Sequence, residues 1–306
     1  MQAQQAAQWN APPLLSNESQ AAQSRAGLRR ILCVSDLQAP SDLALGRATA
    51  LGRRFNAQVH VLYVDTLRRS QPVLHVIRDH HGLGPGTRME MFRERPTAGS
   101  IEVRAVTAPL YEALAHIDEQ FNIDMVVVPD GGTNRHSWLN VERIIRSVSS
   151  PVLVVRREAA MPYERITVAT DLSERSLKLS RAMATYGWLD APSIAFVHAF
   201  GLPYRGLRKI PQAIPKHLEL YRTRWQRLVL QQMRADLEIT GLDTTRVSLH
   251  ADLATPIDLI ERHVGNSGAD LLVAGATRFM QLKAPLGKSV TRDLLNRIDC
   301  DILVVT

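Results

Sequence analysis

The stretch RRILCVSDLQAPSDLALGRATALGRRFNAQVHVLYVD, residues 29–65, recurs in altered form as ERITVATDLSERSLKLSRAMATYGWLDAPSIAFVHAF, residues 164–200. In each copy a short apolar run ends in an aspartate, Asp36 or Asp171, and a polar turn follows. Each copy then continues as an amphipathic helical pattern and a second β-rich run. The repeat therefore predicts a strand, a helix and a second strand at the start of each half of the chain.

The ends of the two halves repeat as well. NIDMVVVPDGG (122–132) matches GADLLVAGATR (268–278), and RSVSSPVLVVRR (146–157) matches NRIDCDILVVT (296–306). Between the repeated segments each half carries a long helical stretch, then a strand at 101–106 or 246–252 and a helix at 109–121 or 255–264. The strands are too continuously apolar to face water on one side. We therefore predict an α/β fold in which each half is a doubly wound parallel sheet covered by helices on both faces.

The length of 306 residues agrees with two domains. We predict a flexible tail at residues 1–27, a first domain at 28–158 and a second domain at 163–306, with the join near 157–164. The tail is rich in Gln, Ala and Ser and lacks the continuous apolar core of a secretory signal.

Composition excludes several classes of function. No apolar run is long enough to span a bilayer, so no membrane association is predicted. The two cysteines, Cys33 and Cys300, lie in apolar runs, which indicates buried thiols in a cytoplasmic protein. The net charge of +7 is shared by both halves, and the densest basic cluster, residues 221–234, has the spacing of a solvated helix face. Nucleic-acid binding is not predicted, because no aromatic ladder or zinc-finger spacing accompanies that cluster.

Several motifs together resemble the universal stress protein family, and in particular its tandem, two-copy members. They are ITVATDLSERS (166–176), HAF (198–200), GADLLVAG (268–275) and DILVV (301–305). The resemblance extends from residue 29 to residue 306. It implies five parallel strands in the order 3-2-1-4-5 in each domain. It also implies that the domains pair through their last strands, so that one chain forms a pseudo-dimer within itself.

The resemblance further implies an ATP or AMP site at the carboxyl edge of the second domain's sheet, with the motif G-x2-G-x9-G-[ST] after strand four. An aspartate ending strand one would contact adenine, and a residue after strand two would line the base pocket. Matched position by position, the implied site residues are Asp171, Ala199, Gly275, Arg278, Lys288, Ser289 and Val290.

Two of the three glycines of this motif are replaced by cationic residues, Arg278 and Lys288. Their charges could hold a phosphate where backbone N–H groups no longer do. Alternatively, their side chains fill the phosphate's space or point to solvent, and the site has been lost. A P-loop is excluded, because Leu282 stands where G-x-x-x-x-G-K-[ST] requires a glycine.

The first domain departs further from the family motif. Asp36 is retained, but Pro129 replaces the first glycine and only Gly132 could match the second. The third glycine and the serine fall near Trp138 and Leu139, whose side chains offer almost no phosphate donors. We predict that this domain has no nucleotide site.

No metal site or catalytic residue is predicted. His80 and His81 are adjacent and have no cysteine or acidic ligand at a motif spacing. His198 and His250 lie near strand ends, where they either line the cleft or are structural. Ser289 would need a positioned base and an oxyanion site to act as a nucleophile, and the sequence has no G-x-S-x-G elbow.

The sequence thus predicts a cytoplasmic tandem stress-response protein that acts by binding and is not an enzyme, with ATP or AMP as the candidate ligand of domain 2. The alternative is a ligand-free protein–protein scaffold with both sites degenerate, and a slow ATPase is a third reading. Residues 67–96 and 201–238 differ most between the halves, so specificity is expected there. A homodimer and another protein partner both remain open.

Overall fold

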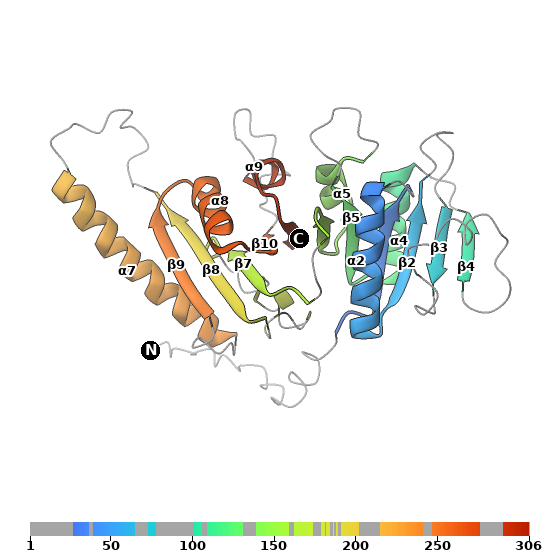
Figure 1. Cartoon of the computed structure of the whole chain (residues 1–306), viewed down its shortest axis with the longest axis horizontal. Coiled ribbons are helices and arrows are strands. Elements are labelled where there is room, and N and C mark those ends of the chain that lie inside the picture. The colour runs from blue at the N-terminus through green and yellow to red at the C-terminus, as the bar shows by residue number, and fades with distance from the viewer. Residues whose placement is uncertain are drawn as a thin grey trace, which may run out of the picture.

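The molecule is described by a computed structural model, drawn in Figure 1. The residues described are 27–36, 39–64, 73–77, 101–105, 109–130, 139–158, 162–173, 179–180, 182–183, 186, 188, 191–201, 215–240, 247–275 and 290–305. Residues 1–26 of the predicted tail, residues 78–100 of the first domain and residues 276–289 of the second domain lie outside them.

In the described part of the chain, one sheet of 11 strands runs through both halves (Figure 1). Its order is β4-β3-β2-β1-β5-β6-β11-β10-β7-β8-β9. The strands of the first half are β1 (Arg30–Ser35), β2 (Gln58–Tyr63), β3 (Val73–Ile77), β4 (Ile101–Ala105), β5 (Met125–Pro129) and β6 (Val152–Val155). Those of the second half are β7 (Arg165–Ala169), β8 (Ser193–Phe200), β9 (Val247–Leu253), β10 (Leu271–Gly275) and β11 (Asp301–Val305).

The second half has the predicted topology. Its strands follow the order β9-β8-β7-β10-β11, which is 3-2-1-4-5 in chain order, and every neighbouring pair is parallel. The carboxyl ends of β7 and β10 therefore meet at one edge of the sheet, on the side where the chain order of the strands reverses. This places Asp171 and Gly275 at the same edge.

The prediction of five parallel strands is wrong for the first half. An additional strand, β3, lies between β2 and β4 and pairs antiparallel with both. The chain between β2 and β3, residues 64–72, is shorter than the dozen or more residues that a parallel crossover requires. A strand that follows so soon can only return antiparallel, and it displaces the predicted third strand by one position.

Helices cover both faces of the sheet. The apolar sides of α2 (Ala39–Phe55) and α7 (Pro215–Ile239) pack on one face, where Leu51 and Met233 are among the buried residues. The opposite face is covered by α4 (Leu110–Phe121), α5 (Val141–Ser147), α8 (Pro256–Ser267) and α9 (Val290–Arg297). Much of the helix predicted after Asp171 lies outside the described residues. No helix of the described part is both long and apolar enough to cross a membrane.

Local sequence explains where these helices begin and end. In α2 the buried residues Ala44, Ala48 and Leu51 recur at three- and four-residue intervals, the spacing of one helix face. Helix α8 begins after Thr255, whose hydroxyl accepts a hydrogen bond from the N–H of Asp258. It ends at Gly268, whose φ of 61° is a left-handed conformation that glycine adopts without a Cβ clash.

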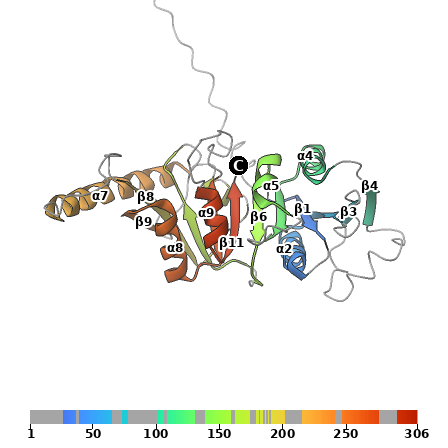
Figure 2. The ribbon, with the colours of Figure 1, turned by 90° about the horizontal axis from the view of Figure 1, so that it is seen from above.

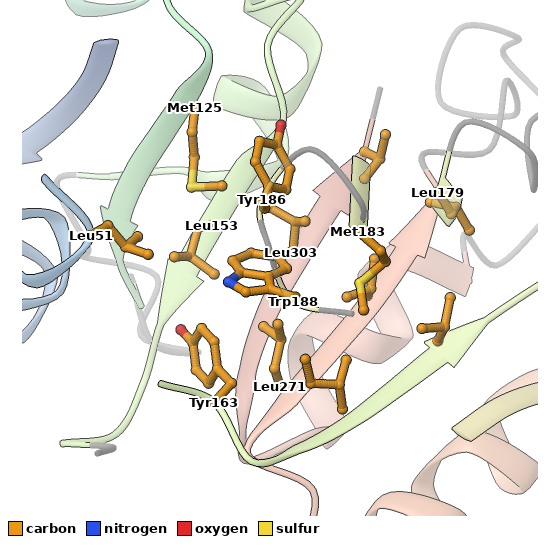
Figure 3. Close-up of a cluster of buried hydrophobic side chains, with 14 of the residues drawn as sticks. Leu51, Met125, Leu153, Tyr163, Leu179, Met183, Tyr186, Trp188, Leu271 and Leu303 are labelled. Carbon is orange, nitrogen blue, oxygen red and sulfur yellow. The ribbon is translucent and has the colours of Figure 1, made fainter. Parts of the chain in front are cut away.

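The two halves join through their last strands. Strands β6 and β11 pair antiparallel, with Leu303 opposite Leu153. The clusters of buried side chains on both faces continue across this pair, so the halves share one core on each side of the sheet. Figure 3 shows Tyr163 and Trp188 beside Leu153 and Leu303, which come from both sides of the join.

A buried carboxylate ties the connecting segment to both halves. Asp301, at the start of β11, is fully buried and forms a 3.0 Å ion pair with Arg47 of α2. Its Oδ1 accepts hydrogen bonds from the backbone N–H groups of Arg156 and Arg157, at 2.8 and 3.2 Å. Its Oδ2 accepts one from the hydroxyl of Tyr163 at 2.7 Å. Burial, together with the charge of Asp301, raises the pKa of Tyr163 well above its usual value.

A second ion pair links the helices on the other face. Arg292 of α9 donates two hydrogen bonds to the carboxylate of Glu142 in α5, at 2.6 and 2.8 Å. This pairing lowers the pKa of Glu142, because the hydrogen bonds from Arg292 favour the ionised form. Figure 2 shows α5 and α9 beside β6 and β11, next to the join.

Candidate functional site

Asp171 lies two residues after the end of β7, and it is exposed at the carboxyl edge of the sheet. Its Oδ1 accepts hydrogen bonds from the backbone N–H of Ser173 at 3.0 Å and from the Ser173 hydroxyl at 2.5 Å. This local turn orients the carboxylate at the strand end. An exposed, oriented carboxylate is able to accept a hydrogen bond from a ligand.

The residue after Asp171 has an unusual backbone conformation. Leu172 has a φ of 57°, and a leucine rarely adopts this left-handed region. The N–H of Leu172 donates to the hydroxyl of Thr170 at 3.2 Å, which supports the turn. Strained backbone of this kind is concentrated at ligand sites, so the turn is consistent with a binding role.

The strand next to β7 supports the same edge. His198 of β8 places its Nδ1 2.9 Å from the carbonyl oxygen of Thr170. A carbonyl only accepts, so Nδ1 carries the proton and the ring ties the ends of the two strands together. Ala199, predicted to line a base pocket, lies in β8 opposite Asp252 of β9. This contact with Thr170 supports a structural role for His198.

Gly275 is the last residue of β10 and lies opposite Val305. A Cβ at this position would meet only a methyl carbon of Leu179, at 3.9 Å, which is an ordinary van der Waals contact. Packing of the described residues therefore does not require a glycine here. Val290 is the first residue of α9.

The remaining predicted site residues are Arg278, Lys288 and Ser289, and all three lie outside the described residues. The structure brings Asp171, Ala199 and Gly275 to one edge of the second half of the sheet, because they lie at or just after the ends of neighbouring parallel strands.

A small hollow lies beside the turn after β7. It is lined in part by Thr170, Leu172 and Phe196, and its volume is about 10 Å³. That volume accommodates about one water molecule. An adenine ring would therefore have to lie outside this hollow.

The corresponding aspartate of the first domain is in a different environment. Asp36 is buried, with 7% of its surface exposed, and its Oδ1 accepts a 2.6 Å hydrogen bond from the Ser41 hydroxyl. The same hydroxyl accepts a hydrogen bond from the Asp36 N–H at 3.3 Å. The carboxylate of Asp36 is thus used in a hydrogen bond within the protein, whereas Asp171 faces solvent.

The described residues near the strand-four end of the first domain make contacts within the protein. Pro129 ends β5 and is buried, and Leu139 is part of the buried core. Asp130, which follows Pro129, lies 3.6 Å from the guanidinium of Arg156. The other positions named for this domain, Gly132 and Trp138, lie outside the described residues.

No group of three or more histidine, cysteine or carboxylate side chains that could hold a metal occurs within the described ranges. His80 and His81 are not among those residues. Both cysteines are buried and form no disulfide.

The structure also reveals a cavity that sequence reasoning missed. It lies at the outer strand β9, where His250 and Asp252 meet Arg222 of α7 and Arg262 and His263 of α8. The sequence singled out His250 because it lies near a strand end. The partners of His250 and Asp252 come from two other helices, and no local motif indicates such pairings.

These features define a class of protein: two copies of an α/β sandwich joined edge to edge, with one exposed strand-end aspartate in the second copy. A sequence profile of the universal stress protein family matches residues 27–156 and again residues 162–306. The chain belongs to the universal stress protein family, with two family domains.

Solved structures with the same fold cover nearly the whole chain. A candidate universal stress protein from Pseudomonas aeruginosa UCBPP-PA14 is 17% identical, with a TM-score of 0.56, over 92% of this chain and 94% of that one. A protein of unknown function from Pseudomonas aeruginosa PAO1 is 16% identical, with a TM-score of 0.56 and the same coverage of 92% and 94%.

A universal stress protein from Archaeoglobus fulgidus DSM 4304 is 12% identical, with a TM-score of 0.50, over 90% of this chain and 97% of that one. At these identities the likeness establishes the fold and not the ligand. A comparison with curated proteins found no significant match.

Proposed function

We propose that this chain is a cytoplasmic stress-response protein that acts by binding an adenine nucleotide, ATP or AMP, in its second domain. The observation that carries the proposal is the contrast between the two strand-end aspartates. Asp171 is exposed and oriented by its own turn, whereas Asp36 is buried against Ser41. Only the second domain presents this carboxylate to a ligand.

The chemistry of the edge agrees with a nucleotide. The carboxylate of Asp171 can accept a hydrogen bond from the amino group of adenine. Helix α9 begins at Val290, close in sequence to the cationic residues Arg278 and Lys288. A helix N-terminus and cationic side chains both favour a phosphate group.

We propose binding without turnover. His198, the histidine at this edge, contacts the carbonyl oxygen of Thr170 rather than a serine hydroxyl. A nucleophile needs a base within hydrogen-bond reach, and the described residues around Asp171 include no such pair. A slow ATPase would have to use residues other than these.

The test is mass spectrometry of nucleotide released from the purified protein, followed by calorimetric titration with ATP and AMP. We expect binding by the wild-type protein and its loss in Asp171→Ala and Lys288→Glu. Asp36→Ala is the matched control, and it should bind as the wild type does if it remains folded. Equal binding by Asp171→Ala and the wild type would overturn the proposal, as would a wild-type protein that binds neither nucleotide.

A second candidate function is a ligand-free scaffold for a protein partner, which includes a second copy of this chain. It is favoured by α7, which carries the large exposed apolar side chains of the described part: Leu220, Trp225, Leu228 and Ile239. Exposed apolar patches mark protein contact surfaces, where tryptophan and arginine side chains are enriched. A wild-type protein without nucleotide, whose oligomeric state changes in Trp225→Glu, would favour this candidate.

A further inference from the structure

A cavity of about 270 Å³ lies at the outer edge of the second domain's sheet, and we call it the edge cavity. Its wall is formed by β9, the last strand of the sheet, together with α7 and α8. These helices pack on opposite faces, as Figure 2 shows, so the cavity wraps around the strand edge. It is separate from the strand ends of β7 and β10, where the nucleotide is proposed.

One carboxylate in the edge cavity positions two guanidinium groups. The Oδ1 of Asp252 accepts a hydrogen bond from Arg222 Nε at 2.9 Å, and its Oδ2 accepts one from Arg262 at 3.0 Å. Arg222 extends from α7 and Arg262 from α8, so the pair converges from both faces of the sheet. Because Asp252 already holds them, these side chains need little further ordering to bind an anion.

Both arginines retain unused donors. Arg222 uses only Nε and Arg262 only one terminal nitrogen in hydrogen bonds to described residues. A guanidinium has five N–H groups in a planar fork that matches the oxygens of carboxylates and phosphates. Two guanidinium groups beside one cavity therefore provide several N–H donors for an anion.

The outer backbone edge of β9 already makes a hydrogen bond with a side chain of α7. The side-chain amide of Gln226 donates a 2.9 Å hydrogen bond to the carbonyl oxygen of Ala251 in β9. This contact covers the outer backbone of the strand at the cavity, which disfavours the addition of a further strand there. A small ligand fits the edge cavity better than an extended peptide does.

Two histidines complete the wall. The rings of His250 and His263 lie 4.5 Å apart, centroid to centroid, at 49°. The Nε2 of His263 is buried and has no hydrogen-bond partner within the described part of the chain. Burial lowers the pKa of His263, and the proximity of His250 lowers it further. The ring is therefore neutral at neutral pH and can gain a proton when an anion binds beside it.

We propose that the edge cavity binds a small molecule through a compact oxyanion, a phosphate or carboxylate group, held by Arg222 and Arg262. Protonation of His263 strengthens this binding as the pH falls.

The charges around the edge cavity support this assignment. The charged and titratable groups that line it are Arg222 from α7, His250 and Asp252 from β9, and Arg262 and His263 from α8. With a neutral His263, the two arginines and Asp252 leave one net positive charge, and protonation of His263 adds another. Attraction to an anion therefore increases toward acid pH.

The volume indicates what else the ligand contains. The edge cavity, at about 270 Å³, is far larger than the hollow of about 10 Å³ beside β7 that accommodates one water, and it exceeds the space of a bare phosphate group. Leu230, Leu249 and Leu259 also line it, and they can contact an apolar part of the ligand. The ligand class is thus a small organic phosphate or carboxylate.

The test uses the full chain and two probes, inorganic sulfate as a stand-in for a phosphate group and acetate for a carboxylate. Both probes stay almost fully ionised between about pH 6 and about pH 8, so a change in affinity over that range reports on the protein. Resonances of the His250 and His263 rings are followed by NMR, at matched ionic strength in chloride. We expect saturable shifts with at least one probe, and tighter binding at the lower pH.

Each of Arg222→Gln and Arg262→Gln should weaken binding about tenfold or more, because a hydrogen bond to a charged group is lost. Arg234→Gln removes an exposed arginine of α7 outside the edge cavity and is the matched control. The side chain of Arg262 is about half exposed, at 55%, so its replacement tests the site even if Arg222→Gln does not fold. His263→Gln should reduce the pH dependence.

Three results would overturn the proposal: shifts no larger than those in chloride, equal losses in Arg234→Gln, or affinity that does not change with pH. Stronger binding of sulfate or of acetate identifies the class of oxyanion. None of these outcomes depends on nucleotide binding at Asp171, so this proposal and the proposed function can fail separately.

Discussion

At the scale of single residues, Asp301 shows how much one buried charge organises. Its carboxylate accepts hydrogen bonds from the connecting segment and from Tyr163, and it pairs with Arg47, whose side chain is only 3% exposed. Removing one partner of such a pair leaves the other buried and uncompensated. The cost of losing Asp301 should therefore exceed that of any surface ion pair.

We predict that Asp301→Asn lowers the free energy of unfolding by about 3–5 kcal/mol, because Arg47 keeps its charge without a counter-charge. The urea midpoint, followed by circular dichroism, measures this loss. Asp299→Asn is the control, since Asp299 lies two residues away, is 87% exposed and only reaches Arg157 at 3.8 Å. Equal midpoints for the two variants would contradict the prediction.

The two thiols provide a second test at this scale. Cys33 and Cys300 are buried, and burial together with the charge of Asp301 raises the pKa of Cys300 to about 12. A thiol in this environment stays protonated at about pH 8 and reacts slowly, since the thiolate is the nucleophile. We expect no reaction with Ellman's reagent in the native protein and reaction of both thiols in urea. Rapid labelling of the folded chain would show that the segment around Cys300 opens readily.

At the scale of elements, helix α8 depends on its first turn. The Thr255 hydroxyl accepts the N–H of Asp258 at 3.4 Å and donates to the Asp258 carboxylate at 2.5 Å. The hydrogen bond from Thr255 lowers the pKa of Asp258, and so does its pairing with Arg297. A lowered carboxylate pKa means that this contribution is present above the unfolded pKa and is lost as the pH falls through the folded one.

We predict that Thr255→Ala destabilises the chain by about 1 kcal/mol, the usual cost of losing an N-cap side chain. Thr255→Ser keeps the hydroxyl and should retain most of that stability. The difference between the two variants should shrink below about pH 4, where Asp258 becomes protonated. Urea unfolding at neutral and acid pH measures both effects, and a serine variant as weak as the alanine variant would exclude the capping explanation.

Local pattern predicted most elements of this fold, because apolar periodicity and strand length are properties of short segments. Strands β1, β2 and β5 and helices α2 and α4 all lie where the sequence placed them. The strand β3 was missed because it lies in a segment that differs between the halves, so the repeat offered no template for it.

Fewer features of the candidate sites than of the fold could be predicted from the sequence. Asp171 and Gly275 could be placed from strand ends alone, since parallel strands end at one edge. The burial of Asp36 against Ser41 could not be predicted, because nothing in the repeated motif distinguishes Asp36 from Asp171. The pairing of Asp252 with Arg222, 30 residues away, depends on how α7 packs at the sheet edge.

At the scale of the whole molecule, the join between β6 and β11 makes the halves interdependent. Leu303 is fully buried opposite Leu153, and the cores on both faces of the sheet continue across this pair. Without the first half, β11 would become an exposed edge strand whose residues 302–305 are all apolar. Edges of that kind pair with other chains.

We predict that a fragment of residues 162–306, expressed alone, does not remain a monomer. Its β11 edge lacks β6, and Asp301 lacks Arg47, so a second copy of the fragment is the nearest partner that can cover the apolar edge. Light scattering after gel filtration should give twice the fragment's mass, or aggregates. Leu303→Arg in the fragment should prevent the dimer by placing a charge in its centre, whereas the exposed substitution Asn296→Arg should not. A monodisperse, folded monomer of the unmodified fragment would contradict the prediction, because it would mean that the second half stabilises its sheet without the first.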